Sequence, residues 1–197
     1  MNAEIDVTGV CLTTPRLRIR EWHKEDLQDF YEYASMEEIG HMAGWNRHTC
    51  IEDSQKILDL FIREKKTFAV VWKQTGKVIG SIGLEPIHVN IDDHYELKKG
   101  REIGYALHRG AWGKGIMPEA VREVIRYCFE ELNYDFLCCG HFLFNHQSQR
   151  VIEKLGFHYL KDVDFSTQNG QKQQSKLYIM TKEQYKEELI VCTQNKK

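Results

Sequence analysis

The stretch Arg109–Ala120 reads RGAWGKGIMPEA and lies between a segment that alternates like a strand and one with helical periodicity. Gly113 and Gly115 flank a lysine just before the predicted helix. Glycines let backbone N–H groups converge, and a helix N-terminus adds positive potential, so such a turn can hold phosphate. Pro118 lacks an N–H and suits the first helical turn. Taken alone, the stretch is equally well explained as a plain turn with Lys114 in solvent.

Spacing excludes two common phosphate-binding motifs at this turn. A Walker A loop ending at Gly113 and Lys114 would require glycine in place of His108 and a hydroxyl residue in place of Gly115. A dinucleotide fingerprint would require glycine where Pro118 stands. The turn therefore predicts a pyrophosphate held by backbone groups without a metal ion.

Composition indicates one globular domain. The chain has 197 residues with 42% hydrophobic and 28% charged residues, and its formal charge of −2 favours no nucleic-acid partner. We expect a single domain over residues 1–197 with a core at about 12–183. The first residues resemble no signal peptide, and no apolar run approaches transmembrane length, so we expect a cytoplasmic protein without a membrane partner.

Cysteine and histidine spacing suggests neither disulfides nor a metal. The six cysteines form no C-x-x-C pair, and the adjacent Cys138 and Cys139 should point to opposite faces of a strand, as suits reduced thiols. No H-E-x-x-H occurs, and His141 with His146 has no third ligand at useful spacing, so no metal site is expected.

Hydrophobic periodicity predicts a mixed α+β order, with an early hairpin and a late strand–helix–strand–helix unit. Strands are expected at 16–22, 67–72, 78–87, 101–107, 136–140, 157–163 and 176–180. Helices are expected at 27–34, from Thr49 onward, at 121–132, at 145–155 and after Thr181. Thr49 and Glu52 suggest a capping box, Gly156 a C-cap, and residues 88–100 and 166–175 polar loops.

A second motif follows the short buried strand at 136–140. Residues 145–157 read NHQSQRVIEKLGF, with small and polar residues at fixed offsets on a helix, and the chain opens from Leu12 with LTTPRLRIREW. Together with the glycine turn, these segments resemble the GNAT superfamily of N-acetyltransferases, most closely the RimJ/RimL type that acetylates protein N-termini. The resemblance spans nearly the whole chain. It implies the GNAT fold, with a mixed, mostly antiparallel sheet that splays at the acetyl-CoA site and helices on both faces.

The resemblance also implies the residues that bind acetyl-CoA. The pyrophosphate loop falls on residues 112–117, where Trp112 and Met117 replace the family's usual residues, so backbone binding should persist while side-chain contacts differ. The strand residues would line the pantetheine arm, and Asn145 would hydrogen-bond that arm. The full implied set is Ile103, Gly104, Tyr105, Trp112, Gly113, Lys114, Gly115, Ile116, Met117, Asn145 and Ser148.

In the family, the departing thiolate has a hydrogen-bonding partner, and the residue usual for that role is absent from this sequence. Many family members carry a tyrosine seven residues after the asparagine, but Ile152 stands there. The resemblance to the RimJ/RimL branch makes Ser148 the candidate partner of the sulfur. The alternative is that Asn145 is only a helix N-cap and Ser148 only a first-turn residue, since both are good local choices.

The acceptor amine must lose a proton before it attacks the thioester. An α-amine has an ordinary pKa of about 8 and a lysine about 10.4, so a weak base serves an N-terminus more easily. Glu102 is the leading base, although it could equally be a solvated strand residue, and Glu85 is second. A backbone N–H near Ile103–Tyr105 could polarise the carbonyl oxygen.

Acceptor-side residues are weakly indicated by the sequence. Trp45, in the polar segment GWNRH, could border the acceptor site. An acidic loop could attract an ammonium group, although such charges are commonly only solvated. Its members are Asp92, Asp93, His94 and Glu96.

The favoured function is acetyl-CoA-dependent N-acetylation of a protein N-terminal α-amine by direct attack on the thioester. Two alternatives keep the cofactor. In one, the acceptor is a small-molecule amine such as an aminoglycoside, a polyamine or an amino-acid-like compound. In the other, the chain is a CoA-binding regulatory module without turnover. A further alternative is an interaction protein that binds no CoA, and both a monomer and a homodimer are compatible with the sequence.

Overall fold

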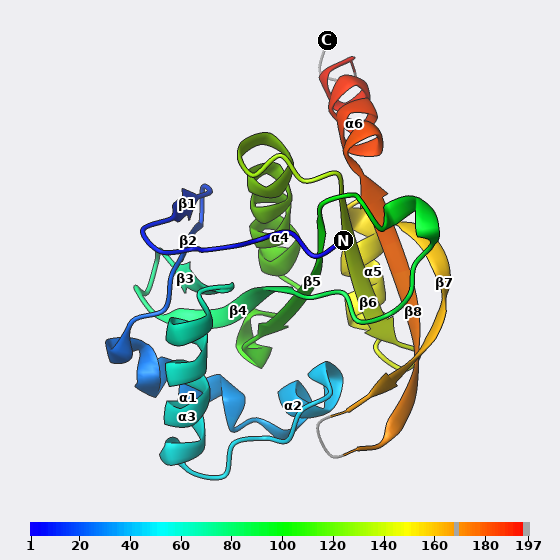
Figure 1. Ribbon diagram of the computed structural model, residues 1–197. Helices are drawn as coiled ribbons and strands as arrows, with labels where there is room; N and C mark the ends of the chain where they lie inside the picture. Colours follow the sequence, from blue (N-terminus) through cyan, green and yellow to red (C-terminus); the bar gives the residue numbers. More distant parts are fainter. Residues whose placement is uncertain (168–169, 195–197) are drawn as a thin grey trace.

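The computed structural model describes residues 1–167 and 170–194 and is built on one eight-stranded sheet (Figure 1). The strands are β1 (Cys11–Thr13), β2 (Leu17–Arg20), β3 (Thr67–Trp72), β4 (Val78–Glu85), β5 (Gly100–Leu107), β6 (Phe136–Phe142), β7 (His158–Ser166) and β8 (Lys172–Thr181). The helices are α1 (Leu27–Ala34), α2 (Glu37–Ala43), α3 (Ile51–Glu64), α4 (Ile116–Arg126), α5 (His146–Lys154) and α6 (Lys182–Gln194). Short 3₁₀ turns lie at Lys24–Asp26, Asp93–Tyr95 and Arg109–Ala111, and α4 continues as a π-helical turn at Tyr127–Glu131.

The sheet is mixed and mostly antiparallel, with strand order β1-β2-β3-β4-β5-β6-β8-β7. Each neighbouring pair is antiparallel except β5 and β6, which run parallel. The parallel pair requires a crossover, and α4 supplies it between the two strands. The predicted α+β class and the mostly antiparallel sheet are confirmed.

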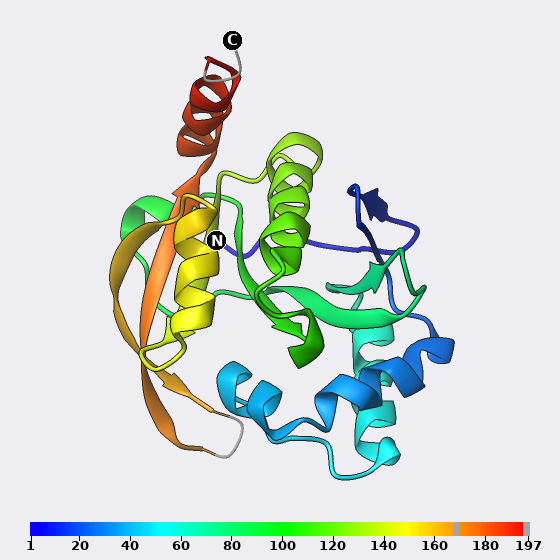
Figure 2. The same ribbon diagram turned by 180° about the vertical axis from the view of Figure 1, so that it is seen from behind.

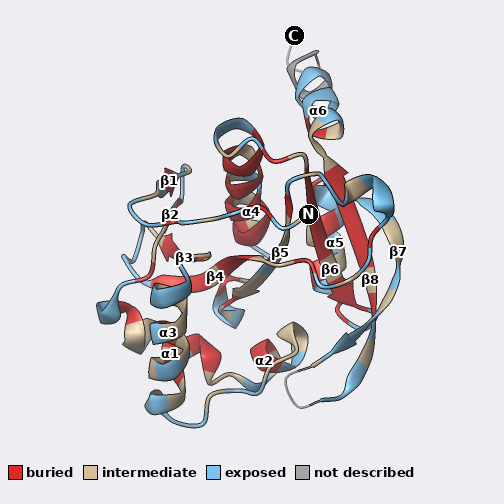
Figure 3. Cartoon of the chain, in the orientation of Figure 1, coloured by how far each residue is buried: buried red, intermediate tan, exposed pale blue. Residues whose placement is uncertain are grey.

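Helices cover both faces of the sheet. The turned view in Figure 2 shows α4 and α5 on one face, where they bury a large cluster that includes Ile103, Val121 and Ile152. On the other face α1, α2 and α3 cover β3 and β4 around Phe30 and Leu58. Figure 3 shows buried residues concentrated along the central strands and α4, while α6 is largely exposed.

Several predicted elements are confirmed at or near their predicted bounds. β3 matches its predicted range, and α1 begins and ends where expected. Gly156 follows α5 with φ of 83°, the left-handed conformation of a helix C-terminus. Thr181 caps α6 reciprocally, because its hydroxyl accepts from the Gln184 N–H while the Gln184 side chain accepts from the Thr181 N–H at 2.8 Å.

Other boundaries differ from the prediction for physical reasons. The strand predicted at 16–22 is limited to β2, which pairs with the unpredicted β1, and α2 was also not predicted. The loop predicted at 166–175 is shorter, because residues 166 and 172–175 belong to β7 and β8, which extend past the core as a hairpin in which exposed polar side chains are tolerated. Residues 168–169 of that segment lie outside the described residues.

The predicted capping box at α3 is wrong in its partner. The helix begins after Cys50, and Asp53 rather than Glu52 receives hydrogen bonds from the N–H and hydroxyl of Thr49, at 3.0 and 2.9 Å. Thr49 lies one residue before the N-cap Cys50, and its partner Asp53 is the third residue of the helix. The hydrogen bonds from Thr49 lower the pKa of Asp53 to about 2.

The two adjacent cysteines point to opposite faces, as predicted. Cys138 belongs to the cluster under the 87–95 segment, and Cys139 belongs to the cluster under α4 and α5. Within residues 1–167 and 170–194, no helix is long and apolar enough to cross a membrane.

Two parallel strands separate at the centre of the sheet. Residues Gly100–Ile103 of β5 pair with Phe136–Cys139 of β6, and the last pair joins Ile103 to Cys139. Beyond that pair β5 continues to Leu107 and β6 to Phe142, and Figures 1 and 2 show the strands diverging toward α2. We call this separation the fork. The predicted splay of the sheet is confirmed.

Two glycines of β5 have different amounts of space around them, and substituting each of them tests how β5 packs against its neighbours. A Cβ added at Gly100 would lie 2.4 Å from the Phe136 ring, whereas one at Gly104 would meet no heavy atom within 4 Å. We expect Gly100→Ala to lower the free energy of unfolding by about 1–3 kcal/mol through overpacking. Gly104→Ala should change it by less than about 0.5 kcal/mol. Urea unfolding measures both, and equal losses would contradict the strand geometry.

Candidate active site

The glycine turn presents open backbone at the start of α4. Gly113 and Gly115 have φ of 72° and 70°, a left-handed conformation that side-chain-bearing residues rarely adopt. A Cβ at Gly113 would meet nothing within 4 Å, so the turn can be approached closely. The helix begins at Ile116, and Pro118 lies in its first turn as predicted. This geometry suits a phosphate group held by N–H groups and the helix N-terminus.

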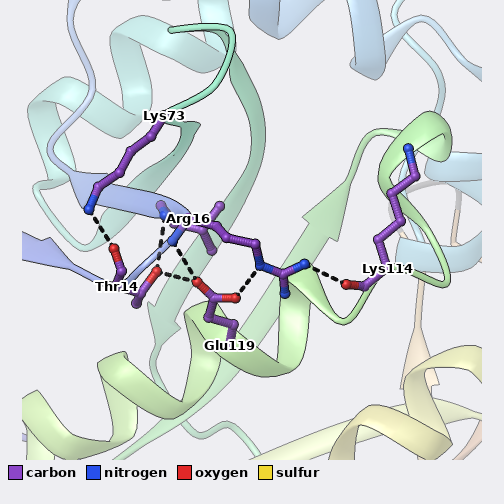
Figure 4. A network of polar contacts seen from close by, with 6 residues as sticks. Thr14, Arg16, Lys73, Lys114 and Glu119 are labelled. Atoms are coloured by element: carbon purple, nitrogen blue, oxygen red, sulfur yellow. Dashed lines mark hydrogen bonds and ion pairs between the residues drawn. The ribbon is translucent and has the colours of Figure 1, made fainter.

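Arg16 fixes this turn from the segment before β2 (Figure 4). Its Nη1 donates to the carbonyl oxygen of Lys114 at 2.8 Å, and its Nε donates to Glu119 Oε2 at 2.6 Å. Glu119 also accepts from Thr14 Oγ1. Burial disfavours the charged form of Glu119, but the hydrogen bonds from Thr14 and Arg16 hold its pKa below the ordinary value. The guanidinium therefore sits beside the turn in a defined orientation.

The same arginine also adds positive charge where the turn is open. Its Nη2 lies 3.6 Å from the position that a Cβ on Gly115 would take. Sequence reasoning treated Arg16 only as the first residue of a strand. The arginine contacts residues about a hundred positions away, and no local pattern signals such a contact.

Several residues predicted to bind acetyl-CoA have side chains in the core. Ile103, Ile116 and Met117 are buried. The indole N–H of Trp112 donates to the Leu107 carbonyl oxygen at 2.8 Å. The three buried side chains leave only backbone groups to meet a cofactor at these positions, whereas Trp112 is half-buried. Lys114 instead places its ammonium 5.3 Å from the ring centre of Trp72.

On the face of the sheet covered by α4 and α5, β5 and α5 meet at the fork through two hydroxyl groups. Tyr105 Oη lies 2.8 Å from Ser148 Oγ and 3.3 Å from the Ser148 carbonyl oxygen. Asn145 is the N-cap of α5, because its Oδ1 accepts from the Ser148 N–H at 3.0 Å. Its Nδ2 donates to the Met42 carbonyl oxygen at 2.9 Å, tying α5 to α2. The capping role weighed in the sequence analysis is therefore real.

On the opposite face, Glu102 lies beside a surface made of glycines. β5 side chains alternate, so Glu102 and Tyr105 point to opposite sides of the sheet. Gly104 is exposed, and a Cβ at Gly140 would lie 3.6 Å from Glu102 Oε1. Small residues beside the fork leave room for a ligand to approach this carboxyl group.

Burial makes the Glu102 carboxyl a weaker acid than usual. Its pKa rises to about 7, first because the group is desolvated and second because the Glu85 carboxylate is nearby. Glu85 pairs with Lys66 at 2.7 Å, so that lysine neutralises Glu85 rather than Glu102. A carboxyl group with this pKa is half ionised near neutral pH and can act as a general base.

A small cavity lies near the open end of the fork, between α2, the end of β6 and the β7–β8 hairpin. It measures about 70 Å³. Phe142, on the same face of β6 as Gly140, forms part of its wall. The lining side chains within the described residues carry no carboxylate, lysine or arginine, and they are His41, Trp45, Asn46, Phe142, Phe144, Thr167, Gln171 and Gln173. Trp45 thus lines a cavity, and its predicted place at the acceptor site stays a prediction.

The acidic loop that could attract an ammonium group packs over another part of this face. Ile87, Ile91 and Tyr95 cover the first half of β6, away from the open end of the fork. Asp92 caps a short turn by accepting from the His94 N–H at 2.8 Å. No group of three or more His, Cys, Asp or Glu side chains suited to a metal ion occurs within residues 1–167 and 170–194.

Known proteins are similar to this chain in sequence and in fold. A family model for the acetyltransferase (GNAT) domain matches residues 16–158. The uncharacterized N-acetyltransferase p20 of Bacillus licheniformis is 34% identical over 128 residues, which make up 62% of this chain and 67% of that protein.

Two solved structures are similar across most of the chain. Ribosomal-protein-S5-alanine acetyltransferase of Vibrio fischeri aligns with a TM-score of 0.68 at 23% identity, covering 88% of this chain and 97% of that one. Spermidine N-acetyltransferase of Vibrio cholerae, solved with CoA and spermine, aligns with a TM-score of 0.70 at 18% identity, covering 87% and 99%. The family match, the forked sheet and the glycine turn agree, and the chain belongs to the GNAT family of acetyltransferases.

Proposed function

We propose that this acetyltransferase moves the acetyl group of acetyl-CoA to the α-amine of a protein or peptide N-terminus. One observation carries the proposal. A carboxyl group with a pKa of about 7, Glu102, and a hydroxyl pair, Tyr105 and Ser148, lie on opposite faces of β5 beside the fork. A base on one side and a partner for the leaving sulfur on the other are what direct attack on a thioester requires.

The residues present fit acetyl-CoA. The pyrophosphate would meet the N–H groups of residues 113–117, with the Arg16 guanidinium beside them. The pantetheine arm would add to β5 beyond Ile103, where β6 no longer pairs with it. That path would bring the thioester to the fork, between Glu102 and Ser148.

The reaction then follows from these positions. The acceptor amine reaches the fork across the exposed backbone at Gly104 and forms the new C–N bond. Glu102 takes the proton that the amine nitrogen loses. The C–S bond breaks with its electron pair on sulfur, and Ser148 donates a hydrogen bond to that sulfur. The thiolate takes its proton from solvent as CoA leaves.

The pKa of Glu102 supports an α-amine as acceptor. An α-amine with a pKa of about 8 lies within about one unit of this base, whereas a lysine or alkyl polyamine lies more than three units above it. The described residues that line the cavity near the fork include no carboxylate, lysine or arginine, which suits an uncharged side chain next to the N-terminus. A polyamine would need carboxylates there.

A panel of acceptors tests the proposal. Release of CoA thiol from acetyl-CoA would be followed with peptides bearing free N-termini, the same peptides blocked at the N-terminus, spermidine, aminoglycosides and free amino acids. We expect turnover with free peptides only. Turnover with spermidine or a free amino acid alone would replace the peptide by a small-molecule acceptor. CoA binding without turnover on any amine would favour a regulatory module.

Replacing the base should change both rate and pH dependence. We expect Glu102→Gln to lower kcat/KM by about 10²–10⁴-fold. The wild-type rate should rise with pH through two ionisations, that of Glu102 near 7 and that of the amine, whereas the variant keeps only the second. Initial rates from pH 5.5 to 9 measure this, and an unchanged rising limb would exclude Glu102 as the base.

Two controls separate chemistry from folding. Burial is the main cause of the raised pKa of Glu102, and Glu85→Gln removes only the additional effect of the Glu85 charge, so the rising limb should move to lower pH with little loss of maximal rate. The pKa of Glu102 is raised in the folded state above the ordinary 4.5, so wild-type stability falls as pH rises through about 7. Glu102→Gln lacks this loss and should be the more stable protein above pH 7, so reduced activity there would not reflect unfolding.

The glycine turn gives a separate test of CoA binding. We expect Gly115→Glu to weaken CoA binding by more than about 100-fold, because the new carboxylate would stand in the phosphate position and pair with Arg16. Gly76→Glu is the matched control, since Gly76 has a similar φ of 73° in an exposed hairpin turn. Calorimetry measures both variants. Unchanged affinity in Gly115→Glu would refute the assignment of this turn.

A further inference from the structure

The hydroxyl of Tyr105 occupies a position that the sequence analysis did not anticipate. Tyr105 was expected only to line the pantetheine arm, and the tyrosine usual for the family is replaced by Ile152, which is fully buried. The structure nevertheless brings a phenol to within 2.8 Å of Ser148 Oγ, from β5 rather than from α5. Tyr105 lies two residues past Ile103, where the pairing of β5 with β6 ends.

Ser148 is held on two sides. Its N–H donates to Asn145 Oδ1 at 3.0 Å, which fixes the first turn of α5, and its side chain meets Tyr105 Oη. The serine is 9% exposed, so few other partners can reach its hydroxyl. A serine hydroxyl carries one proton and can rotate, so its donor direction depends on what its oxygen accepts.

Tyr105 is suited to be the donor of this pair. Burial raises the pKa of Tyr105 well above its ordinary value, so the phenol keeps its proton. When the phenol donates to Ser148 Oγ, the serine proton is left to point elsewhere. A hydroxyl that accepts one hydrogen bond also becomes a stronger donor for the next.

We propose that Tyr105 is a positioning residue that donates to Ser148 Oγ and thereby directs the serine proton at the sulfur of the departing CoA. This inference rests on the proposed function. Tyr105 does not transfer its proton. The C–S electron pair goes to sulfur, Ser148 stabilises that charge by a hydrogen bond, and the thiolate is protonated by solvent.

The test compares two acyl donors. Acetyl-CoA releases a thiolate, and the selenoester of selenocoenzyme A releases a selenolate, which is a weaker base and needs less stabilisation. We expect Ser148→Ala to lower kcat with acetyl-CoA by about 100-fold and Tyr105→Phe by about 10-fold. Both losses should shrink to about twofold or less with the selenoester, while the KM for each donor changes little. A loosened α5 would slow both donors equally.

A double variant shows whether Tyr105 acts through Ser148. We expect Tyr105→Phe combined with Ser148→Ala to be no slower than Ser148→Ala alone, because the tyrosine has nothing left to orient. Additive losses would overturn the proposal, as would wild-type kcat in Tyr105→Phe. Tyr178→Phe is the control. It removes a hydroxyl whose partner is His141 rather than Ser148, with Tyr178 Oη 3.3 Å from His141 Nε2, and it should keep the wild-type rate.

The outcomes separate this inference from the proposed function. Absence of acetyl transfer by the wild-type protein to any amine in the panel would remove the proposed function and the inference with it. Wild-type transfer together with a Tyr105→Phe variant that loses the same factor on both donors would leave the function standing and reject the role of Tyr105.

Discussion

The end of pairing between β5 and β6 at Ile103 and Cys139 is the constraint on which the rest of the site depends. A strand in the middle of a sheet normally has both edges paired, because buried backbone N–H and C=O groups are costly to leave unpaired. The fork leaves backbone of β5 available to a ligand at the centre of the molecule. The order of the sheet supports this opening, because β4 on one side and β8 on the other hold the two strands in place.

The chemistry of the site follows from alternation along β5. Successive side chains point to opposite faces, so the strand brings Glu102 to one side and Tyr105 to the other within three residues. Burial acts on both groups in useful directions, raising the pKa of the carboxyl to about 7 and keeping the phenol protonated. The raised pKa of Glu102 destabilises the fold above neutral pH, which is the kind of strain expected at a functional site.

Local patterns in the sequence predicted much of this molecule. The glycine turn and the alternation of β5 depend on residues a few positions apart, and both were predicted correctly, while the cap at Asn145 was the alternative weighed for that residue. Contacts between distant segments were not predicted. Arg16 reaches Lys114, and Tyr105 reaches Ser148, across 98 and 43 residues, and only the folded sheet brings them together. The α2 helix was missed for a different reason, since its seven residues are too few to establish helical periodicity.

The most direct test of the account is hydrogen–deuterium exchange with and without acetyl-CoA. If the fork and the glycine turn hold the cofactor, amides within 104–107 and 112–117 should exchange more slowly when acetyl-CoA is bound, while those of α3 and α6 stay unchanged. Protection that appeared only around the cavity lined by Trp45 and Phe142, with 104–107 unaffected, would contradict the claim that the separation of β5 and β6 is the acetyl-CoA site.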